Sequence, residues 1–596
     1  YACLRLSDGD NASTAPTRIV AARTMPTICA GLPSGAYLPS FHDDASDDRI
    51  HRVVLPYREQ VPNKPGQFLE IGLKRVTLDC ADDQAWQSAQ LGRCLYLGGA
   101  MLAQYDGRRW AEAGFHYAPD EITTSKSAGG SLTSSTVYGW IVVPEEVNAQ
   151  GEIDRGPASV PVTVTMGGAD TRVTLTIPTI RLTGRTNVRL AVYRSAPDDD
   201  SIYYRVSSVD PSASAGSNRY VANDPTVDTV TFVDDMSDAL AAESETLYTT
   251  GGVLSNDPPP TARALTVSKS RLFWTDPADD NLIRYSQQIA DGYGAELTDR
   301  LAIAVDPYGG AVTGIAALDD YLVVFKETAI YIVGGDGPLA NPSADAASGF
   351  TEPALVTSDV GCLRPLSVSA TPIGILFQSQ KGIYLLGRDR SVSYVGAPVE
   401  AYNAQTVRRT VLLPDRTQIL LVCDSGRSLL YDYLFQQWST FTNHEGLSAA
   451  VVGGSLYYLR TDDRVFEETP GVYVDDNSQI QLEVTTAWLH LDDVLQGLQL
   501  VYHLHLLGAR LSAHQLEMGY QVDYVTHWSD PIRVDARAFD GSLYGDGAYG
   551  DGVYGGSGEA AYQWRWHLCQ PCQSIRFRFR GVEDYGAAGA AYEITE

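Results

Sequence analysis

The chain has 596 residues, of which 44% are apolar and 20% are charged, an ordinary globular composition that excludes a disordered or fibrous protein. Its 44 basic and 73 acidic residues leave a net charge of −29, which argues against an electrostatic grip on nucleic acid or on an anionic membrane. No apolar run approaches the ~20 residues of a membrane span, so we expect no membrane insertion. The start, YACLRL, predicts no secretory signal.

Short runs of Val, Ile, Leu, Tyr and Phe alternate with polar residues and end at Gly, Asp or Pro, while helical periodicity is almost absent. This pattern predicts an all-β protein. One larger unit recurs: an apolar strand, a turn rich in Gly, Asp or Lys, and a second apolar strand. Each unit predicts a β-hairpin. The hairpins are expected at 94–110, 271–286, 321–337, 374–389, 419–441 and 455–467.

The hairpins recur at the period of β-propeller blades, which is about 40–50 residues. Equivalent apolar residues of the last five hairpins are spaced by 51, 52, 45 and 36 residues. These residues are Trp274, Phe325, Phe377, Val422 and Tyr458. The equivalent Tyr96 lies 178 residues before the first of them, which predicts an insertion. Removing the 127 residues 120–246 leaves 51, one blade length.

The insertion and the end of the chain differ in character from the hairpin repeat. Residues 120–246 hold seven short strands separated by turn residues, which is typical of an immunoglobulin-like sandwich. After residue 478, a long strand pair at 515–525 and 574–581 flanks a Tyr-Gly repeat at 542–556. The sequence therefore predicts a β-propeller with an inserted sandwich and a C-terminal β-domain. Its regions are 1–119, the first part of the propeller; 120–246, an immunoglobulin- or fibronectin-like β-sandwich; 247–478, the remainder of the propeller; and 479–596, a C-terminal β-sandwich-like domain.

No phosphate-binding G-x-x-x-x-G-K-[ST], H-E-x-x-H, G-x-S-x-G or EF-hand signature occurs in the chain. We therefore expect no enzymatic activity, no catalytic or cofactor-binding residue, no metal ligand and no cofactor. Eight cysteines are too sparse for a disulfide scaffold, and we expect most to be buried thiols. They are Cys3, Cys29, Cys80, Cys94, Cys362, Cys423, Cys569 and Cys572.

Two small groups of residues have spacings that chemistry can use. Cys569 and Cys572 have redox-motif spacing, but they lack the helix start that lowers a thiol pKa, and no second pair exists for zinc. Whether they pair with each other stays open. His503 and His505 share one strand face and could present two imidazoles to a metal. Because no carboxylate or cysteine stands at ligand spacing, a polar strand face is favoured.

Acidic runs and one basic strand invite both a functional and a structural interpretation. A glycosidase needs two carboxylates across a cleft, whereas solvated aspartates normally collect in turns, and turns are favoured here. The strand Ile575–Arg580 places three arginines on one face, which could bind phosphate. Pairing with Glu517 and Asp523 across the sheet is favoured instead. The acidic runs are Asp43–Asp44, Asp47–Asp48, Asp198–Asp200 and Asp234–Asp235.

The Tyr-Gly repeat also allows two interpretations. Its residues Tyr544, Tyr549 and Tyr554 could form an aromatic contact loop or pack on their own domain.

Three segments carry a family resemblance. They read NDPPPTARALTVSKSRLFWTD at 256–276, GYGAELTDRLAIAVDPYGGAVTGIAALDDYLVVFKETAIYIVGGDGP at 292–338, and DVGCLRPLSVSATPIGILFQSQKGIYLLGR at 359–388, followed by VSYVGAPVE. These phrases resemble the tail nozzle proteins, also called tail tubular or stabilisation proteins, of short-tailed bacteriophages. The resemblance extends over most of residues 120–596.

The resemblance implies a structural virion protein located in the tail. Such proteins form a homo-oligomeric ring, usually a hexamer, at the distal end of the short tail, and the genome leaves through the central channel. The implied partners are other copies of the chain, the tail adaptor protein, tail fibre or spike proteins that attach to the ring, and viral genomic DNA that passes without tight binding. Six copies would carry 174 excess negative charges, so we expect Asp and Glu to dominate the channel wall. Because only six lysines occur, most positive charge sits on arginines, which suit fixed pairing at subunit contacts.

A second hypothesis comes from another class, a propeller-type tail protein that binds or degrades glycans. Propellers commonly place ligand sites at the channel mouth. The segment AQYDGRRW at 103–110 resembles the Asp-Gly…Trp turn of sialidase blades, but this turn occurs once. A free-standing adhesin with an immunoglobulin-like binding module is a third, weaker hypothesis.

Overall fold

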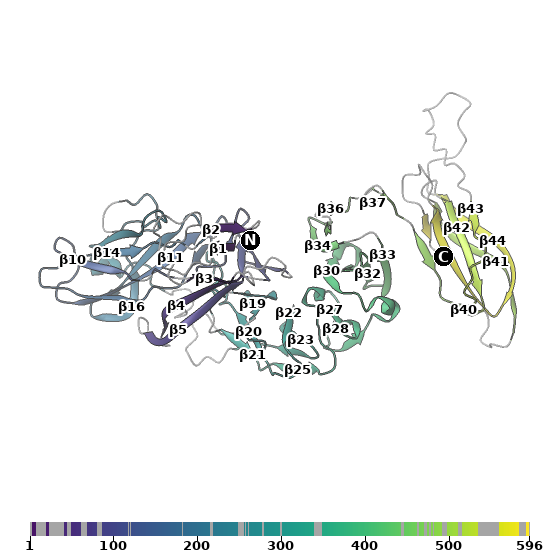
Figure 1. Ribbon diagram of the computed structural model, residues 1–596, viewed down its shortest axis with the longest axis horizontal. Coiled ribbons are helices and arrows are strands. Elements are labelled where there is room, and N and C mark those ends of the chain that lie inside the picture. The colour runs from purple at the N-terminus through teal and green to yellow at the C-terminus, as the bar shows by residue number, and fades with distance from the viewer. Residues whose placement is uncertain are drawn as a thin grey trace, which may run out of the picture. The chain divides into compact units, whose positions relative to one another are not determined.

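Strands supply nearly all of the structure (Figure 1). The computed structural model describes residues 86–247, 256–338, 349–442, 446–534 and 560–582 apart from short gaps, and it describes five strands before residue 86 and one after residue 590 by their backbone alone. In these described residues the one α-helix, α1 (Asp238–Ala241), has four residues, and no helix is long enough to cross a membrane. The chain forms two compact units, Tyr1–Ala449 and Ala450–Glu596.

Consecutive stretches of the chain form antiparallel sheets in which each strand pairs with the next along the sequence. This up-and-down order is that of a propeller blade. Residues 87–467 form five such sheets of four strands and one of three. They are blade 1, β6 (Gln87–Leu91), β7 (Cys94–Gly98), β8 (Ala103–Tyr105) and β9 (Trp110–Glu112); blade 2, β18 (Leu265–Ser268), β19 (Arg271–Thr275), β20 (Leu282–Tyr285) and β21 (Ala302–Ala304); blade 3, β22 (Val312–Leu318), β23 (Tyr321–Lys326), β24 (Ile330–Val333) and β25 (Ala354–Thr357); blade 4, β26 (Ser369–Thr371), β27 (Gly374–Ser379), β28 (Gly382–Gly387) and β29 (Val392–Tyr394); blade 5, β30 (Val407–Leu413), β31 (Gln418–Cys423), β32 (Ser428–Asp432) and β33 (Gln437–Phe441); and blade 6, β34 (Gly446–Val452), β35 (Ser455–Arg460) and β36 (Val465–Glu467).

All six predicted hairpins are confirmed. Each hairpin is the second and third strand of a blade, paired in antiparallel register: β7 with β8, β19 with β20, β23 with β24, β27 with β28, β31 with β32, and β35 with β36. The residues taken as equivalent in the sequence all lie on the second strand of their blade. Short 3-10 helices connect some strands, at Pro365–Ser367, Ala397–Tyr402 and Pro414–Arg416.

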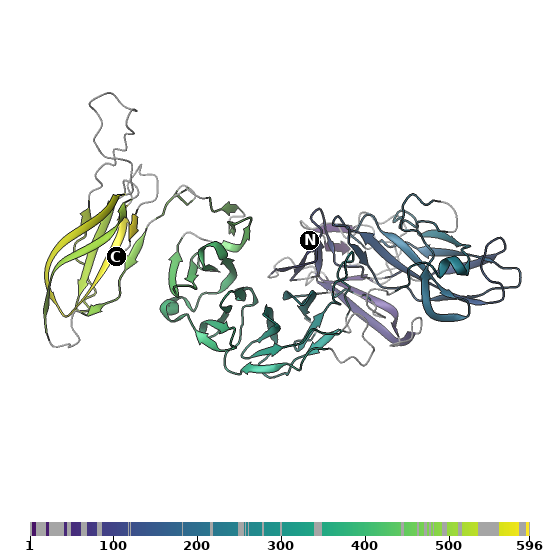
Figure 2. The same cartoon turned by 180° about the vertical axis from the view of Figure 1, so that it is seen from behind.

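The first strands of blades 1 to 5 lie side by side in sequence order, β6 with β18, β18 with β22, β22 with β26, and β26 with β30. Figure 2 shows blades 2 to 5 from behind, following one another from teal to green. Arg409 on β30 also donates from Nη1 to the carbonyl oxygen of Trp86, directly before β6, over 3.4 Å. The first strands of blades 1 and 5 therefore approach each other, as in a propeller.

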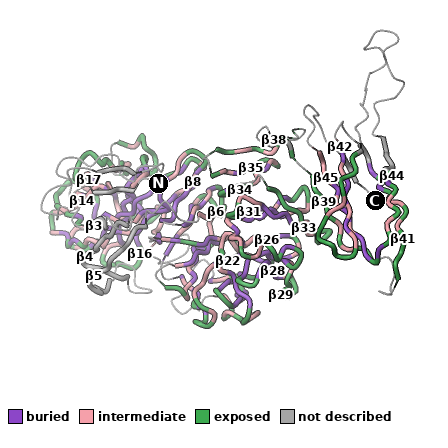
Figure 3. Tube along the Cα trace, turned by 45° about the vertical axis from the view of Figure 1, so that its right-hand side comes forward, coloured by how far each residue is buried: buried purple, intermediate pink, exposed green. Residues whose placement is uncertain are grey.

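Apolar side chains hold neighbouring blades face to face. Successive strand residues point to opposite faces of a sheet. In blade 3, Leu322 and Val324 pack toward blade 2, whereas Val323 and Phe325 pack toward blade 4. Both faces are thus buried, and the purple stretches of Figure 3 mark such strands. Two-sided burial explains why the second strands of the blades are unbroken apolar runs.

The predicted insertion is a separate β-sandwich between β9 and β18. Its eight strands pair with one another in two sheets and not with blade strands. One sheet has the order β10-β14-β17; the other has the order β12-β11-β15-β16, with β13 also paired to β11. The strands are β10 (Thr123–Ser127), β11 (Val137–Val147), β12 (Ile153–Arg155), β13 (Val162–Thr165), β14 (Arg172–Pro178), β15 (Arg189–Ala196), β16 (Asp199–Arg205) and β17 (Thr229–Asp234).

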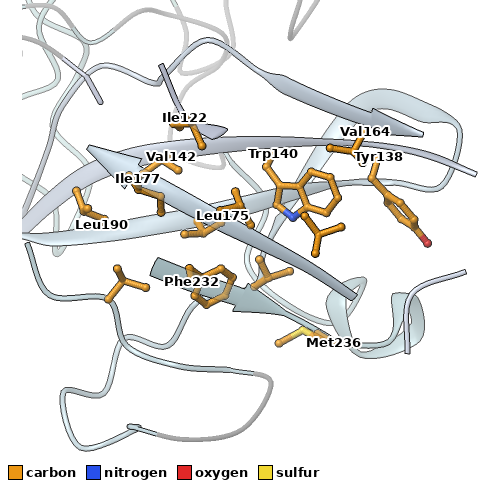
Figure 4. Close-up of a cluster of buried hydrophobic side chains, with 14 of the residues drawn as sticks. Ile122, Tyr138, Trp140, Val142, Val164, Leu175, Ile177, Leu190, Phe232 and Met236 are labelled. Carbon is orange, nitrogen blue, oxygen red and sulfur yellow. The ribbon is translucent and has the colours of Figure 1, made fainter. Parts of the chain in front are cut away.

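The sandwich core lies between these two sheets (Figure 4). Trp140 and Val142 of β11 pack with Leu175 and Ile177 of β14 and with Phe232 of β17. The period of two on β14 places every second residue in this core, as expected for a sheet with one solvated face. A two-sheet β-sandwich is therefore present where the sequence predicted one.

The second unit ends in two further sheets. One has the order β39-β45-β42-β43, with β40 also paired to β45, and the other has the order β44-β41-β46. A core that includes Trp566, Met518 and Phe577 forms from residues of both. Before them, β37 (Val474–Asp475) and β38 (Ser478–Gln479) form a two-stranded sheet of their own. The strands of the two larger sheets are β39 (Glu483–Thr485), β40 (Leu489–His490), β41 (Gln499–Arg510), β42 (Gln515–Val522), β43 (Ile532–Val534), β44 (Ala560–Cys572), β45 (Ser574–Val582) and β46 (Tyr592–Ile594).

Strands before blade 1 form sheets of their own. β1 (Cys3–Leu6) pairs with β2 (Ile19–Ala22), and β3 (Phe41–Asp44), β4 (Arg49–Gln60) and β5 (Phe68–Asp79) form a three-stranded sheet. Within the region 1–119 assigned to the propeller, residues 87–112 are those that form a blade. The division into two compact units falls inside β34, before the C-terminal domain predicted to begin at residue 479.

Candidate functional site

The two cysteines at redox-motif spacing lie on β44 and do not form a disulfide. Cys569 is exposed and Cys572 is buried. Burial, together with the nearby Asp523 carboxylate, raises the pKa of Cys572 above its ordinary value. A redox nucleophile needs a lowered thiol pKa, so Cys572 is not suited to that role. Of the other cysteines, Cys94, Cys362 and Cys423 are free and buried, and the first three of the chain lie outside the residues whose side chains are described.

His503 and His505 share one face of β41, as predicted, with ring centroids 6.1 Å apart. The register adds His567 of β44, whose ring lies 4.4 Å from that of His503. Arg565 approaches His503 Nε2 to 3.0 Å. Partial desolvation, Arg565 and the neighbouring histidines lower the pKa of His503. Among the described residues, no group of three potential ligands is arranged to hold a metal.

The acidic runs take mainly structural roles. Asp198 Oδ1 accepts a hydrogen bond from the Val137 backbone N at 2.8 Å, and Asp199 Oδ1 accepts one from Ser201 N at 2.9 Å, as turn aspartates do. Asp234 differs from the solvated turn residue predicted: it is fully buried and bound to Arg194 Nη1 and Trp140 Nε1, both at 2.8 Å. A buried carboxylate is retained because it is paired and hydrogen-bonded. Asp43–Asp44 are described by backbone alone, and Asp47–Asp48 lie outside the described residues.

The sialidase-like turn at 103–110 is also structural. Asp106 Oδ1 accepts hydrogen bonds from the backbone N of Arg108 at 2.9 Å and of Arg109 at 2.7 Å, and Oδ2 accepts one from Ala149 N at 3.1 Å. Trp110 packs on Tyr105 with ring centroids 4.8 Å apart. The carboxylate thus fixes the turn and ties it to the inserted sandwich. The Tyr-Gly repeat with Tyr544, Tyr549 and Tyr554 lies outside the described residues.

The sequence interpretation missed a buried charge network in the sandwich. Glu145 on β11 is fully buried, and its oxygens lie 3.1 Å from Arg155 Nε, 3.0 Å from Arg189 Nε and 3.0 Å from Arg205 Nη1. Burial alone would favour the neutral acid, but the three arginines hold the pKa of Glu145 below its ordinary value. Glu245 joins the network through Arg155 and Arg205.

A second part of this network joins the sandwich to blade 1. Arg185, buried and at the end of a sandwich loop, binds Asp154 Oδ2 at 2.8 Å and Glu146 Oε2 at 3.0 Å. The same guanidinium donates to Gln104 Oε1 at 3.1 Å and to the carbonyl oxygen of Glu112 at 2.8 Å, both in blade 1. In the sequence, the charge-dense segment PEEVNAQGEIDRG at 144–156 was the feature that could have indicated this network. These contacts describe a rigid joint, because every partner is hydrogen-bonded.

No family model and no curated protein matches the chain. Among solved structures, the chain is similar to BamB from Moraxella catarrhalis at 11% identity over 65% of this chain and 95% of that one, with a TM-score of 0.24. It is also similar to the WD40 β-propeller domain of Doa1, at 11% identity over 50% and 75%, with a TM-score of 0.23. A chain of the nidogen/laminin complex gives 14% identity over 33% and 70%, with a TM-score of 0.23.

Proposed function

We propose that this chain is a structural virion protein, a tail nozzle subunit that forms a ring-shaped DNA-ejection conduit at the distal end of a short phage tail. The observation that carries the proposal is the resemblance of the segments at 256–276, 292–338 and 359–388 to nozzle proteins. In the structure these segments contain β18, β19 and β21 to β24 of blades 2 and 3, and β26 to β28 of blade 4. The resemblance therefore falls on the packed blades.

The fold suits a load-bearing role. Blades packed face to face leave only short edges, and the joint at Arg185 ties the sandwich to blade 1. Such a subunit transmits force instead of deforming. In this proposal the chain meets copies of itself, a tail adaptor and tail fibre or spike proteins, and it needs no cofactor. The arginines of the buried network are engaged within the subunit, so the arginines expected at subunit contacts must be others.

The acidic balance suits a channel through which DNA slides. A wall rich in Lys or Arg would exchange the condensed counterions of DNA for fixed cations, and each contact would slow ejection. A subunit with a net charge of −29 lets Asp and Glu dominate that wall. The wall then repels the phosphates that pass it.

The test is the assembly state and shape of the purified chain. For a hexamer of 64.6-kDa subunits we expect a native mass of about 390 kDa and, by electron microscopy, a ring with a central channel. Cryo-electron microscopy of the particle should place the ring at the tail tip. A monomer at micromolar concentration that also stays single in the particle contradicts the proposal. Saturable binding on a glycan array, or turnover of a polysaccharide that an aspartate substitution abolishes, favours the glycan hypothesis instead.

A further inference from the structure

One sheet of the C-terminal unit carries an unusual outer face. On β45 the residues Ile575, Phe577 and Phe579 point into the core, so the alternating Arg576 and Arg578 lie on the opposite side. We call the side that bears these arginines the outer face. In an antiparallel sheet, residues directly opposite one another share a face. The register therefore shows which charges on the outer face are balanced and which are not.

One end of the outer face is balanced. Arg580 lies directly between Glu483 of β39 and Glu517 of β42. Glu517 in turn lies opposite Arg533 of β43, with Oε2 3.5 Å from its Nε. Two arginines thus face two glutamates. The cross-strand pairing with Glu517 that the sequence predicted is consistent with this arrangement.

The next two rows are not balanced. Arg578 lies between Thr485 and Gly519, neither of which carries a charge. Arg576 lies opposite Gln521 and donates from Nε to its Oε1 at 2.5 Å. Within the described residues, neither arginine has a carboxylate partner. Asp523, expected to pair with this strand, instead accepts hydrogen bonds at Oδ1 from the backbone N of Gln573 at 2.7 Å and of Ser574 at 3.0 Å.

Two tryptophans hold these arginines in place. The Arg576 guanidinium lies 4.8 Å from the Trp488 ring centroid and 5.2 Å from that of Trp528, and the Arg578 guanidinium lies 4.4 Å from Trp528. Gly519 leaves room for this stack, since even a Cβ there would already contact the Trp528 ring at 3.7 Å. Stacking on an aromatic face orients a guanidinium without satisfying its N–H donors. The terminal N–H groups of both guanidinium groups therefore stay available for oxygen ligands.

We propose that the outer face binds an extended acidic polypeptide segment of another chain, with carboxylates at alternate positions. Residues two apart on a strand are about 6.8 Å apart, and alternate residues of an extended partner repeat at the same distance. Each stacked arginine can then take one carboxylate through two parallel hydrogen bonds. In a chain of net charge −29, two preorganised cations without acidic partners mark a surface that is complementary to an acidic ligand. The inference does not depend on the virion role.

Fluorescence anisotropy on the full chain tests this. The probe is a fluorescein-labelled peptide of six Asp-Thr repeats, compared with a six-repeat Asn-Thr peptide and a labelled twelve-nucleotide oligo-dT. We expect the Asp-Thr peptide to bind saturably at low salt, to weaken as salt rises, and to bind more tightly than the other two probes. The double variant Arg576→Gln/Arg578→Gln should weaken binding roughly tenfold or more, because two charge-assisted contacts are lost.

Matched variants separate the outer face from general charge effects. Arg533→Gln removes one positive charge at the balanced end of the same face and should change the affinity less than about twofold. Arg578→Lys keeps the charge but loses the planar fork, so we expect an intermediate affinity. Equal unfolding midpoints for all variants show that the fold is intact. The proposal is overturned if the Asp-Thr peptide does not bind, if the double variant binds it as well as the unmodified chain does, or if oligo-dT binds more tightly.

Discussion

Glu145 is the residue on which the sandwich charge network converges. Its carboxylate is fully buried and faces three arginines, so the neutral amide of Glu145→Gln would leave their charges poorly compensated. We expect this variant to lower the free energy of unfolding by about 3–5 kcal/mol, the usual cost of breaking a buried ion pair from one side. Urea denaturation followed by tryptophan fluorescence measures it. The control is Asp228→Asn, because the Asp228 carboxylate that pairs with Arg181 is exposed to solvent; this variant should change stability by less than about 1 kcal/mol.

Asp106 should give a pH-dependent contribution to stability. Burial works against its ionisation, yet the three backbone N–H donors and Arg109 hold its pKa below the ordinary value of 3.8. A carboxyl whose pKa is lower in the folded state stabilises the fold above its unfolded-state pKa, and this stability is lost as the pH falls. We expect Asp106→Asn to destabilise the chain by about 1–2 kcal/mol at pH 7 and by less at pH 3. Unfolding curves at both pH values measure this difference, and an equal effect at both would contradict the assignment.

Thiol reactivity should separate Cys569 from the buried cysteines. Burial raises the pKa of Cys94 to about 12, that of Cys362 to about 11 and that of Cys423 to about 12, so these thiols stay protonated and inaccessible. In the native chain at pH 8 we expect Cys569→Ser to remove one fast-reacting thiol in a dithionitrobenzoate assay. Cys423→Ser should leave the number of fast-reacting thiols unchanged, and it should remove one only after denaturation.

At the scale of elements, contacts between neighbouring blades stabilise the fold. Phe325 of blade 3 and Phe377 of blade 4 are fully buried with ring centroids 5.0 Å apart. We expect Phe377→Ala to cost about 3–5 kcal/mol, since a large cavity would remain. The double variant with Phe325→Ala should cost less than the sum of the two single variants, because both remove the same contact. Denaturant unfolding of all four proteins measures this coupling, with Leu355→Ala on the exposed part of β25 as the control.

The sequence predicted hairpins and blades well but predicted polar contacts poorly, for a physical reason. Hairpins such as β27–β28 depend on a local period of two and a turn, and both features can be recognised from residues that are close together in the sequence. The joint at Arg185 depends on partners in Gln104 and Glu112, 81 and 73 positions away. Asp234 was expected in a solvated turn because its partner Arg194 lies on a strand far along the chain. The outer face was expected to be paired with acids, since its tryptophans at 488 and 528 are far from β45 in the sequence.

We expect the whole molecule to bind DNA only weakly. Its net charge of −29 disfavours binding of the DNA phosphates, and arginines such as Arg155 and Arg185 are already paired with carboxylates inside the chain. We expect a dissociation constant for duplex DNA weaker than about 10⁻⁴ M at 150 mM salt. Gel mobility and anisotropy titrations with a labelled 30-base-pair duplex measure it. Micromolar binding that falls steeply with salt would contradict an acidic channel wall.

The position of the inserted sandwich also has a consequence for the order in which the protein is made. Blade 1 ends at Glu112, and its partner β18 begins at Leu265, so about 150 residues must be synthesised between them. At roughly 5–20 residues per second the ribosome needs about 8–30 s to do so. During that interval the face of blade 1 that carries Leu91, Tyr96 and Leu102 waits without the blade 2 residues that later cover it. The sandwich is complete before blade 2 emerges, so it can fold while this face of blade 1 is still uncovered.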